Sequence, residues 1–320
     1  MDVLCSRFIE VEHPDEVSEL VTEGVFQSPF FILGGGSNIL FTKDFAGVVV
    51  HPAFKGIEIL EESQNETVIK VAAGEEWETL QQYCLERQLY GLENLIGIPG
   101  NVGSAPVQNI GAYGTEVKDC IETVEGWRLD TNAPFRFPNA ECRFGYRDSV
   151  FKNELKNKCL ITHVTFRLSK IERYNLKYKA LADELQNRQW SPSLKNVTDC
   201  ILHVRNSKLP DITRIGCAGS FFKNPLIPQQ QYEQLKQEFP DLVSYPAPDG
   251  MVKLAAGQLI EKAGWKGRRL GDAGVYDKQA LVIVNYGGAT PEEILSVCDA
   301  VIRDVEAMFH VHIAPEVNIL

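Results

Sequence analysis

Apolar residues along this chain follow two periods, one of two residues and one of three to four, and each period predicts a different kind of element. Apolar runs predict strands at "FFIL", "GVVV", "IETVEGWRL", "CLITHVTFRL" and "ALVIVNY", and the alternating "HVHIAPEV" predicts one more near the C-terminus. The runs "GIEIL" and "TVIKVAAG" are joined by the turn-rich "EESQNE", which predicts a hairpin.

Helical spacing of apolar residues recurs in several other segments. The first, 14–23, has a proline in its first turn and Gly24 just beyond its end, the usual asymmetry of helix termini. The others are 76–88, "YKALADELQNR", "NVTDCILHVRN", 229–239, 258–263 and 291–309. Because strands and helices alternate irregularly and no internal repeat is visible, the sequence predicts an α+β fold rather than a doubly wound sheet.

A chain of 320 residues has room for two or three domains. Breaks near Pro52 and Arg205 predict three parts, 1–52, 53–205 and 206–320. Hydrophobic residues make up 44% and charged residues 23%, as in ordinary globular proteins. The N-terminus alternates apolar and acidic residues, unlike a signal peptide, and no apolar run approaches the roughly 18 residues of a membrane span. We therefore expect a cytoplasmic protein that does not bind a membrane.

Charge and cysteine usage narrow the expected partners. The net charge of −11 opposes a general nucleic-acid surface, which needs clustered Lys and Arg, so we expect no nucleic-acid partner. As a separate expectation, the chain is a monomer. Eight scattered cysteines, without a C-x-x-C pair or metal-ligand spacing, predict buried thiols of a reducing compartment and no metal site. His310 and His312 alternate within an apolar pattern, and we interpret them as structural.

Three consecutive glycines in "FILGGGSNIL" require a sharp bend or a very close approach of the backbone to another group. The sequence contains neither G-x-G-x-x-G nor G-K-[ST], which excludes a dinucleotide fingerprint and a P-loop. Two readings remain equally supported by this segment: a tight turn between core strands, or a nest of backbone N–H groups that binds an anion, helped by Ser37 and Asn38.

A second glycine-rich segment, 97–114, favours the binding reading. It is too rich in glycine and proline to be a helix or a central strand, and it carries polar Gln108, Asn109 and Tyr113. So many glycines are entropically costly unless the backbone must lie against a flat or anionic ligand. Together the two segments suit a large cofactor that has a pyrophosphate and a ring.

At this point the chain resembles a known family. The motifs "LGGGSNIL", "GLENLIGIPGNVGSAPVQNIGAYG", "CRFGYRDSVF", "GSFFKNP" and the terminal "PEV" are similar, in this order, to those of the UDP-N-acetylenolpyruvoylglucosamine reductases of bacterial peptidoglycan precursor synthesis. The resemblance runs from about Phe31 to the C-terminus. It implies an FAD-binding fold of the vanillyl-alcohol oxidase type, with two α+β subdomains that clasp FAD and a C-terminal α+β domain that binds substrate.

The resemblance also implies roles for individual residues. NADPH would reduce FAD, and the reduced flavin would reduce the enolpyruvyl ether of UDP-N-acetylglucosamine enolpyruvate. Arg147 would polarise the substrate carboxylate, Ser220 would donate the proton, and Glu316 would hydrogen-bond the developing enediolate. Without the motif context, each reads as an ordinary surface or turn residue. The implied FAD contacts are Gly34, Gly35, Gly36, Ser37, Asn38, Gly100, Gly103, Ser104, Gln108, Asn109, Gly111, Ala112 and Tyr113.

Substrate contacts are implied for Tyr178, Lys208, Asn224 and Gln279. Tyr178 matches the tyrosine that folds over the substrate pyrophosphate in the family's longer type. With Tyr174 it also fits a core pair on one helix face, since the two are four residues apart.

Two departures from the family pattern affect expectations. The chain lacks the Asn-Thr-Phe segment that usually precedes the first helix, so we expect weaker FAD retention. Asn318 stands where many members carry a basic residue, so carboxylate anchoring should depend more on Arg147. Two alternatives remain: another FAD-dependent dehydrogenase or oxidase of the same fold, and a non-catalytic flavin-binding protein.

Overall fold

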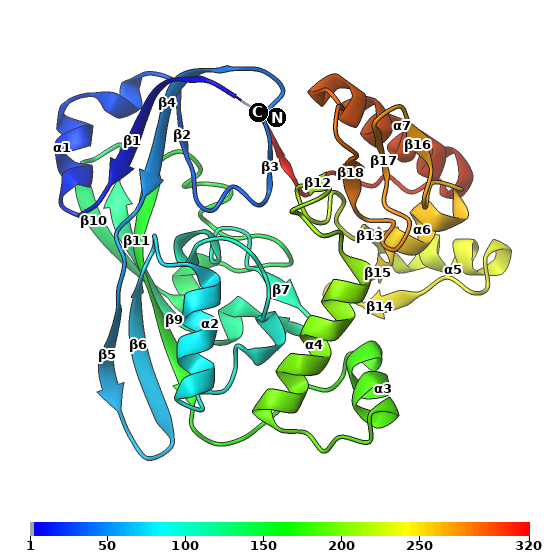
Figure 1. The fold of residues 1–320 in the computed structure, drawn as a ribbon, viewed down its shortest axis with the longest axis horizontal. Coiled ribbons are helices and arrows are strands. Elements are labelled where there is room, and N and C mark those ends of the chain that lie inside the picture. Colours follow the sequence, from blue (N-terminus) through cyan, green and yellow to red (C-terminus); the bar gives the residue numbers. More distant parts are fainter. Residues whose placement is uncertain (1–2) are drawn as a thin grey trace. The chain divides into compact units, whose positions relative to one another are not determined.

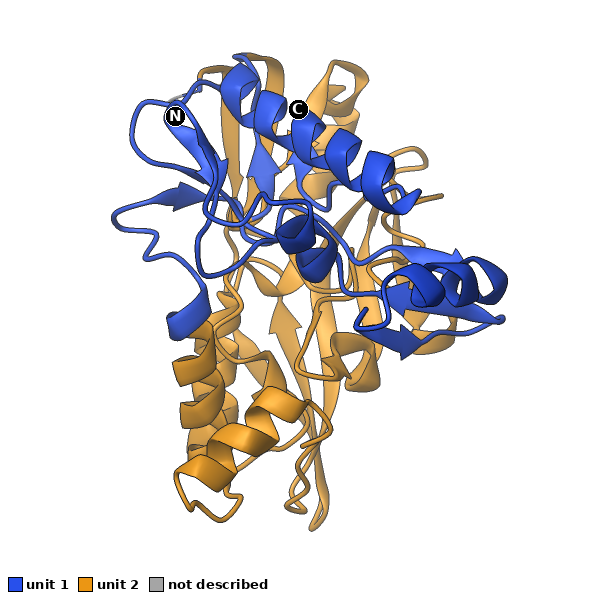
Figure 2. Ribbon diagram, turned by 90° about the vertical axis from the view of Figure 1, so that its right-hand side faces the viewer, with its two compact units in different colours: residues 1–3, 38–44, 206–320 blue, residues 4–37, 45–205 orange. Residues whose placement is uncertain are grey.

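The computed structural model describes residues 3–320, and its contacts divide the chain into two compact units (Figures 1 and 2). The N-terminal unit comprises residues 4–37 and 45–205 and is orange in Figure 2. The C-terminal unit combines residue 3 and the short segment 38–44 with residues 206–320. The finer division of 1–205 into two subdomains at residue 52 stays a prediction.

Two sheets form the frame of the N-terminal unit. In a parallel sheet, β4 lies between β1 and β2, and in an antiparallel sheet the strand order is β10-β9-β11-β6-β5. A further two-stranded hairpin is formed by β7 and β8. The strand bounds are β1 (Cys5–Val11), β2 (Phe30–Ile32), β4 (Phe45–Pro52), β5 (Ile57–Glu62), β6 (Glu66–Ala72), β7 (Gly111–Ala112), β8 (Thr115–Glu116), β9 (Ile121–Arg128), β10 (Ala133–Pro138) and β11 (Cys159–Ser169).

The first two helices of this unit pack on a core that both sheets share, whereas the last two form a smaller core of their own. Trp77 is 1% exposed, and its indole N–H donates to the Leu95 carbonyl at 3.0 Å, which fixes the start of α2 against the loop that follows it. Val50 of the parallel sheet and Val164 of the antiparallel sheet belong to the same cluster of buried residues. The α-helices are α1 (Glu16–Thr22), α2 (Trp77–Glu86), α3 (Lys179–Asn187) and α4 (Leu194–Lys208), and the 3₁₀ turns are η1 (Val25–Gln27), η2 (Glu93–Leu95), η3 (Val102–Ser104), η4 (Val117–Asp119) and η5 (Asn139–Cys142).

The C-terminal unit has its own core, centred on Trp265, Phe221 and Phe309. Its sheets have the strand orders β12-β18-β17-β16 and β13-β15-β14, and β3 pairs in parallel with β19. Their bounds are β3 (Ile39–Leu40), β12 (Gly216–Cys217), β13 (Leu226–Pro228), β14 (Ser244–Pro246), β15 (Met251–Leu254), β16 (Arg269–Leu270), β17 (Ala273–Val275), β18 (Ile283–Asn285) and β19 (Asn318–Ile319), with helices α5 (Gln229–Glu238), α6 (Ala256–Lys262) and α7 (Pro291–Phe309).

Most predicted elements are confirmed within one or two residues. The helix predicted at 291–309 matches α7, because Thr290 and Glu293 form a capping box and Pro291 opens the first turn. Gly24 adopts a φ of +76° directly after α1, as a helix-terminating glycine does. The predicted β5–β6 hairpin is antiparallel. One parallel sheet, several antiparallel sheets and interspersed helices together are the predicted α+β arrangement.

The strand predicted at "HVHIAPEV" is wrong. His310 caps α7 in a left-handed conformation, with φ 52°. The segment makes a single isolated bridge, from Pro315 to Phe222, and a strand begins only at Asn318. Val311 and Ile313 are buried in the core of the C-terminal unit, which explains the apolar alternation without a ladder of hydrogen bonds. His312 is exposed and lies 3.4 Å from the Glu306 carboxylate.

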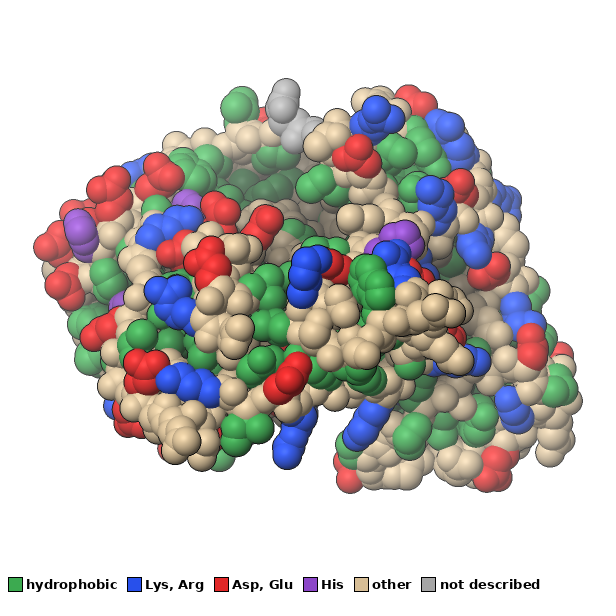
Figure 3. Space-filling view, turned by 60° about the horizontal axis from the view of Figure 1, so that its bottom comes forward, with side chains coloured by type: hydrophobic (Ala, Val, Ile, Leu, Met, Phe, Trp, Pro, Cys, Tyr) green, Lys and Arg blue, Asp and Glu red, His purple; other side chains and the backbone are tan. Residues whose placement is uncertain are grey.

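The charged side chains on the surface are distributed as the mixed acidic and basic composition suggests. Acidic and basic side chains are interspersed over the face shown in Figure 3, so that face carries no continuous area of one sign. Among residues 3–320, no helix is both long enough and apolar enough to span a membrane.

Candidate active site

The first glycine segment leaves the parallel sheet at a fixed point. The backbone N–H of Leu33 donates to the Val50 carbonyl, and Nδ1 of His51 lies 2.8 Å from the Leu33 carbonyl. Beyond that point Gly36 adopts a φ of +69°. Within residues 3–320, the backbone N–H groups of residues 34–37 have no hydrogen-bond partner. Four free donors on one bend form the kind of nest that binds an anion.

The two glycine segments lie directly against each other within the N-terminal unit. A Cβ atom on Gly35 would lie 2.7 Å from Cα of Gly100, and one on Gly103 would lie 2.5 Å from Cβ of Ala73. The Ser37 hydroxyl donates to the Pro99 carbonyl at 3.3 Å. The glycines are therefore required by close backbone contact, and this contact places the free N–H donors beside the 97–114 segment.

This arrangement fits FAD. The free N–H groups of 34–37 suit a pyrophosphate, and the second glycine backbone offers a flat wall with few side chains. Gly34, Ser104, Gln108, Gly111 and Ala112 all lie along these two segments, with Ala112 in the short strand β7.

Arg147 occupies a tight turn that the second segment holds in place. Gly145 and Asp148 close the turn through two backbone hydrogen bonds, and Arg147 has a φ of +55°. The neighbouring Asp148 carboxylate accepts a hydrogen bond from the Asn153 amide. The Nη2 of Arg147 donates to the Gly111 carbonyl at 2.7 Å. The guanidinium is thereby fixed to the proposed cofactor loop.

Asn109 connects that turn to the loop from the inside. It is fully buried, its side-chain amide donates to the Gly145 carbonyl at 2.9 Å and to Glu116, and its carbonyl oxygen accepts from the backbone N–H of Lys118. These internal partners give Asn109 a structural task, whereas its predicted direct contact with FAD stays a prediction.

Tyr113, near the end of the second glycine segment, contacts the segment of the predicted substrate-covering tyrosine. The rings of Tyr113 and Tyr178 meet edge to face with centroids 5.1 Å apart. Asn175 joins the same two segments, since its amide donates to the Gly114 carbonyl at 2.8 Å. Tyr178 is the N-cap of α3 and Tyr174 precedes the helix, so the helix-face pair considered from the sequence is wrong.

In the C-terminal unit the structure brings Ser220, Glu316 and Asn38 together. The backbone N–H of Glu316 donates to the carbonyl of Phe221, the neighbour of Ser220, at 2.8 Å. The Asn38 amide donates to the Glu316 carbonyl at 3.4 Å. Phe221 is 2% exposed, so the backbone on both sides of this contact rests on the core of the unit.

The remaining predicted substrate residues are distributed over the same unit. The Asn224 side chain accepts a hydrogen bond from the backbone N–H of Ala256, the first residue of α6. Gln279 is half-buried, and its side-chain oxygen accepts from the backbone N–H of Leu281 at 3.4 Å. Lys208 is the last residue of α4 and is also half-buried.

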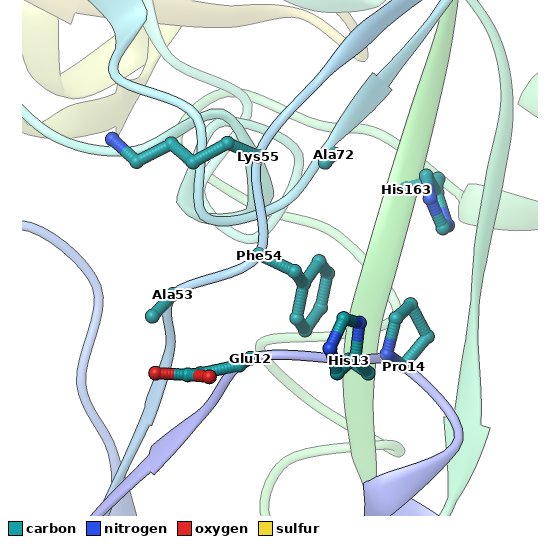
Figure 4. Close-up of a pocket in the computed structure, with 8 residues that line it drawn as sticks. All are labelled: Glu12, His13, Pro14, Ala53, Phe54, Lys55, Ala72 and His163. Atoms are coloured by element: carbon teal, nitrogen blue, oxygen red, sulfur yellow. The ribbon is translucent and has the colours of Figure 1, made fainter.

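A separate pocket of about 460 Å³ opens in the N-terminal unit (Figure 4). Phe54 and His163 approach each other across it, with ring centroids 6.1 Å apart. Burial lowers the pKa of His163, and the nearby Lys70 acts in the same direction. None of the predicted site residues lines this pocket, whose walls are Glu12, His13, Pro14, Ala53, Phe54, Lys55, Ala72 and His163.

Comparisons with known proteins agree with this geometry. Residues 5–132 match the family model described as an FAD binding domain, and residues 211–320 match the C-terminal domain of UDP-N-acetylenolpyruvoylglucosamine reductase. The solved reductase of that name from Thermus caldophilus superposes with a TM-score of 0.67 at 23% identity, over 98% of this chain and 91% of that one. The fold and the site thus define an FAD-dependent oxidoreductase.

Curated relatives narrow the class. The UDP-N-acetylenolpyruvoylglucosamine reductase of Bacteroides fragilis is 42% identical to this chain, over 100% of this chain and 96% of the relative. The reductase of the same name from Chromobacterium violaceum is 45% identical, over 100% of this chain and 95% of the relative. The chain belongs to the UDP-N-acetylenolpyruvoylglucosamine reductase family. The expected FAD-binding fold and FAD cofactor are confirmed.

Proposed function

We propose that this chain reduces the enolpyruvyl ether of UDP-N-acetylglucosamine enolpyruvate to the lactyl ether of UDP-N-acetylmuramate in the bacterial cytoplasm. The observation that carries the proposal lies in the C-terminal unit, where the Ser220 and Glu316 segments are hydrogen-bonded to each other. This unit contains the residues that match the reductase's C-terminal domain.

The cofactor would lie on the two glycine segments of the N-terminal unit. The N–H groups of residues 34–37 would bind its pyrophosphate, and the 97–114 backbone would follow the rest of the molecule. When bound, FAD takes a hydride from NADPH and supplies it to the terminal methylene of the enol ether. Addition there places negative charge on the carbon next to the substrate carboxylate, and the protein must stabilise that charge.

Arg147 would stabilise this charge. A guanidinium stays protonated at all working pH values, so it can polarise the carboxylate toward an enediolate throughout the reaction. Its position is set before substrate arrives, because the turn and the Gly111 carbonyl hold it. Such preorganisation is what makes a positioned cation effective at developing charge.

Ser220 and Glu316 would complete the reaction from the C-terminal unit. Ser220 is exposed and follows Gly219, which has a φ of +75°. A hydroxyl is a weak acid, but a carbanion next to a carboxylate is basic enough to take its proton. The carboxyl of Glu316 would share a hydrogen bond with the enediolate. Tyr178, Lys208, Asn224 and Gln279 would bind the nucleotide and its phosphates.

The test is a half-reaction without oxygen. The flavin is reduced with NADPH, excess nucleotide is removed, UDP-N-acetylglucosamine enolpyruvate is added, and the flavin absorbance is followed. Prompt reoxidation is expected. A flavin that reduces but stays reduced would support another dehydrogenase or oxidase of this fold, and a bound flavin that NADPH never reduces would support a non-catalytic flavin protein.

A further inference from the structure

We propose that Arg205 is a positioning residue that fastens both ends of the glycine segment 97–114 and so holds its backbone ready for FAD. The inference rests on the proposed function in one respect, the assignment of this segment to the cofactor site. Arg205 lies in the last part of α4, the helix drawn in green in Figure 1.

At the first end, Arg205 holds Gly97. Its Nη2 donates to the Gly97 carbonyl at 2.8 Å. Gly97 has a φ of +73°, and a Cβ atom there would lie 3.1 Å from Nε of Arg205 and 3.0 Å from Leu202. The residue at 97 must therefore be small and left-handed, because α4 and its arginine lie directly against it.

At the second end, the guanidinium lies close enough to the Tyr113 side chain for each group to affect the pKa of the other. Burial raises the pKa of Tyr113 to about 12, so its hydroxyl remains neutral and can accept an N–H. Tyr113 has a φ of +49°, and the amide of Asn94 donates to its carbonyl at 2.9 Å. One side chain thus reaches both the beginning and the end of the segment.

The chemistry of these contacts argues for more than packing. Burial lowers the pKa of Arg205, because the guanidinium has lost part of its hydration shell. Tyr113 acts on this pKa in the opposite direction. Neither a glycine carbonyl nor a neutral tyrosine returns a full negative charge, and an apolar side chain would fill this space at lower cost. The forked guanidinium can hold two acceptors at once, which no other side chain does as well.

Fastening the ends of a glycine-rich segment should act on cofactor affinity. Glycine loses more conformational freedom on ordering than any other residue. If Arg205 orders the segment beforehand, FAD does not bear that entropy cost when it binds. The retained positive charge also has the sign that favours an anionic cofactor nearby.

The experiment measures FAD affinity directly, by titrating apoprotein into FAD and following flavin fluorescence. Arg205→Met should raise the dissociation constant about tenfold to a hundredfold, the loss expected for hydrogen bonds from a charged group. Arg205→Lys should give an intermediate value, since an ammonium lacks the fork. Tyr113→Phe should weaken binding less, and adding it to Arg205→Met should cost little more, because the two residues form one contact.

Arg188→Met is the matched control. Arg188 is also a partly buried helix-terminal arginine, but it pairs with Glu184 and does not contact the segment. Its dissociation constant should equal that of the wild type. If Arg205→Met lowers the melting temperature of the apoprotein as Arg188→Met does but leaves FAD affinity unchanged, the role is structural and the proposal fails.

Two safeguards keep the test decisive. If Arg205→Met does not fold, wild-type FAD affinity in both Arg205→Lys and Tyr113→Phe would overturn the proposal. FAD affinity is measured without substrate, so a failure of the anaerobic reoxidation test would remove the proposed substrate and leave this comparison valid.

Discussion

The ammonium group of Lys152 donates a 2.9 Å hydrogen bond to the backbone carbonyl of Arg147. Arg147 is held with φ at +55°, a region that costs a non-glycine residue on the order of 1–2 kcal/mol. A charge-assisted hydrogen bond to its carbonyl can offset this cost. Lys152 therefore helps to keep the turn in the conformation that directs the Arg147 guanidinium toward Gly111.

Lys152→Met should slow flavin reoxidation by substrate about tenfold to a hundredfold, because a small displacement of a positioned group has effects of that size. Flavin reduction by NADPH and FAD affinity should change little. Stopped-flow measurement of the two half-reactions checks this. Lys156→Met serves as the control, because Lys156 is an exposed lysine four residues further along the chain. Equal slowing of both half-reactions would point to general disorder of the turn.

Ser220→Ala should slow flavin reoxidation by substrate by about 10²–10⁴, the usual worth of a positioned proton donor. Reduction by NADPH needs no proton from Ser220, so that half-reaction should keep its wild-type rate. Single-turnover absorbance measurements separate the two. Ser296→Ala, whose hydroxyl donates to a carbonyl within α7, is a suitable control. Normal reoxidation in Ser220→Ala would remove this residue from the mechanism.

Gly35→Ala should weaken FAD binding by about tenfold or more. The added methyl group would lie 2.7 Å from Cα of Gly100, so the two glycine segments must separate, at a cost of about 1–3 kcal/mol. Gly216→Ala introduces the same methyl group in ordinary contact, 3.6 Å from its nearest neighbour, and should leave FAD affinity unchanged. Fluorescence titration with FAD checks both, and equal affinities would contradict the close packing of the segments.

Asn175→Ala should raise KM for the sugar nucleotide several-fold while FAD affinity stays constant. The change removes the 2.8 Å hydrogen bond to Gly114 that holds the segment before Tyr178 next to Tyr113, and a lost neutral hydrogen bond costs about 1 kcal/mol. Steady-state kinetics at saturating NADPH measure it. Asn196→Ala removes a comparable bond to the Ser191 carbonyl and should keep the wild-type KM. A change in kcat alone would contradict the role.

Acidification should destabilise the chain partly through His163. Burial holds the pKa of His163 in the folded state below 6.5, so between that value and 6.5 the unfolded chain binds more protons. Stability therefore falls as pH falls through 6.5 and stops falling from this source below the folded-state pKa. Urea midpoints between pH 5 and 7.5 should decline less in His163→Gln than in the wild type. Parallel profiles would show that the pKa of His163 is the same in the folded and unfolded states and would contradict the prediction.

Local signals explain which elements could be predicted. The capping box and Pro291 specify the start of α7 within a few residues of chain, and the apolar period specifies its length. In contrast, the alternation of apolar and polar residues from His310 to Val317 indicates that one side of the segment is buried. It contains no information about which strand the segment pairs with. Hydrogen-bond ladders depend on distant residues, which is why a strand was wrongly expected there.

The candidate site, like the fold, was predictable only where a feature leaves a local signal in the sequence. Glycine-rich segments indicated the proposed cofactor loops, because left-handed and close-packed backbone leaves a signal in composition. The direction of a polar side chain leaves none: Asn109 has the same appearance in sequence whether it faces a ligand or, as here, the interior. Lys152 and Arg205 were missed for a related reason. The single hint for Arg205 is its place four residues after buried Ile201, on the packed side of α4.

The pairing of β3 with β19 has a consequence for synthesis of the chain. Asn318 bonds through both its backbone and its side chain to the carbonyl of Asn38, a residue made 280 positions earlier. During translation, the segment 38–44 must wait without its strand partner until residues 318–319 leave the ribosome. N-terminal residues generally fold first as they emerge, but long-range pairings of this kind are slow to form. The stretch directly after the proposed anion-binding nest thus reaches its final structure late, only after residues 318–319 have been made.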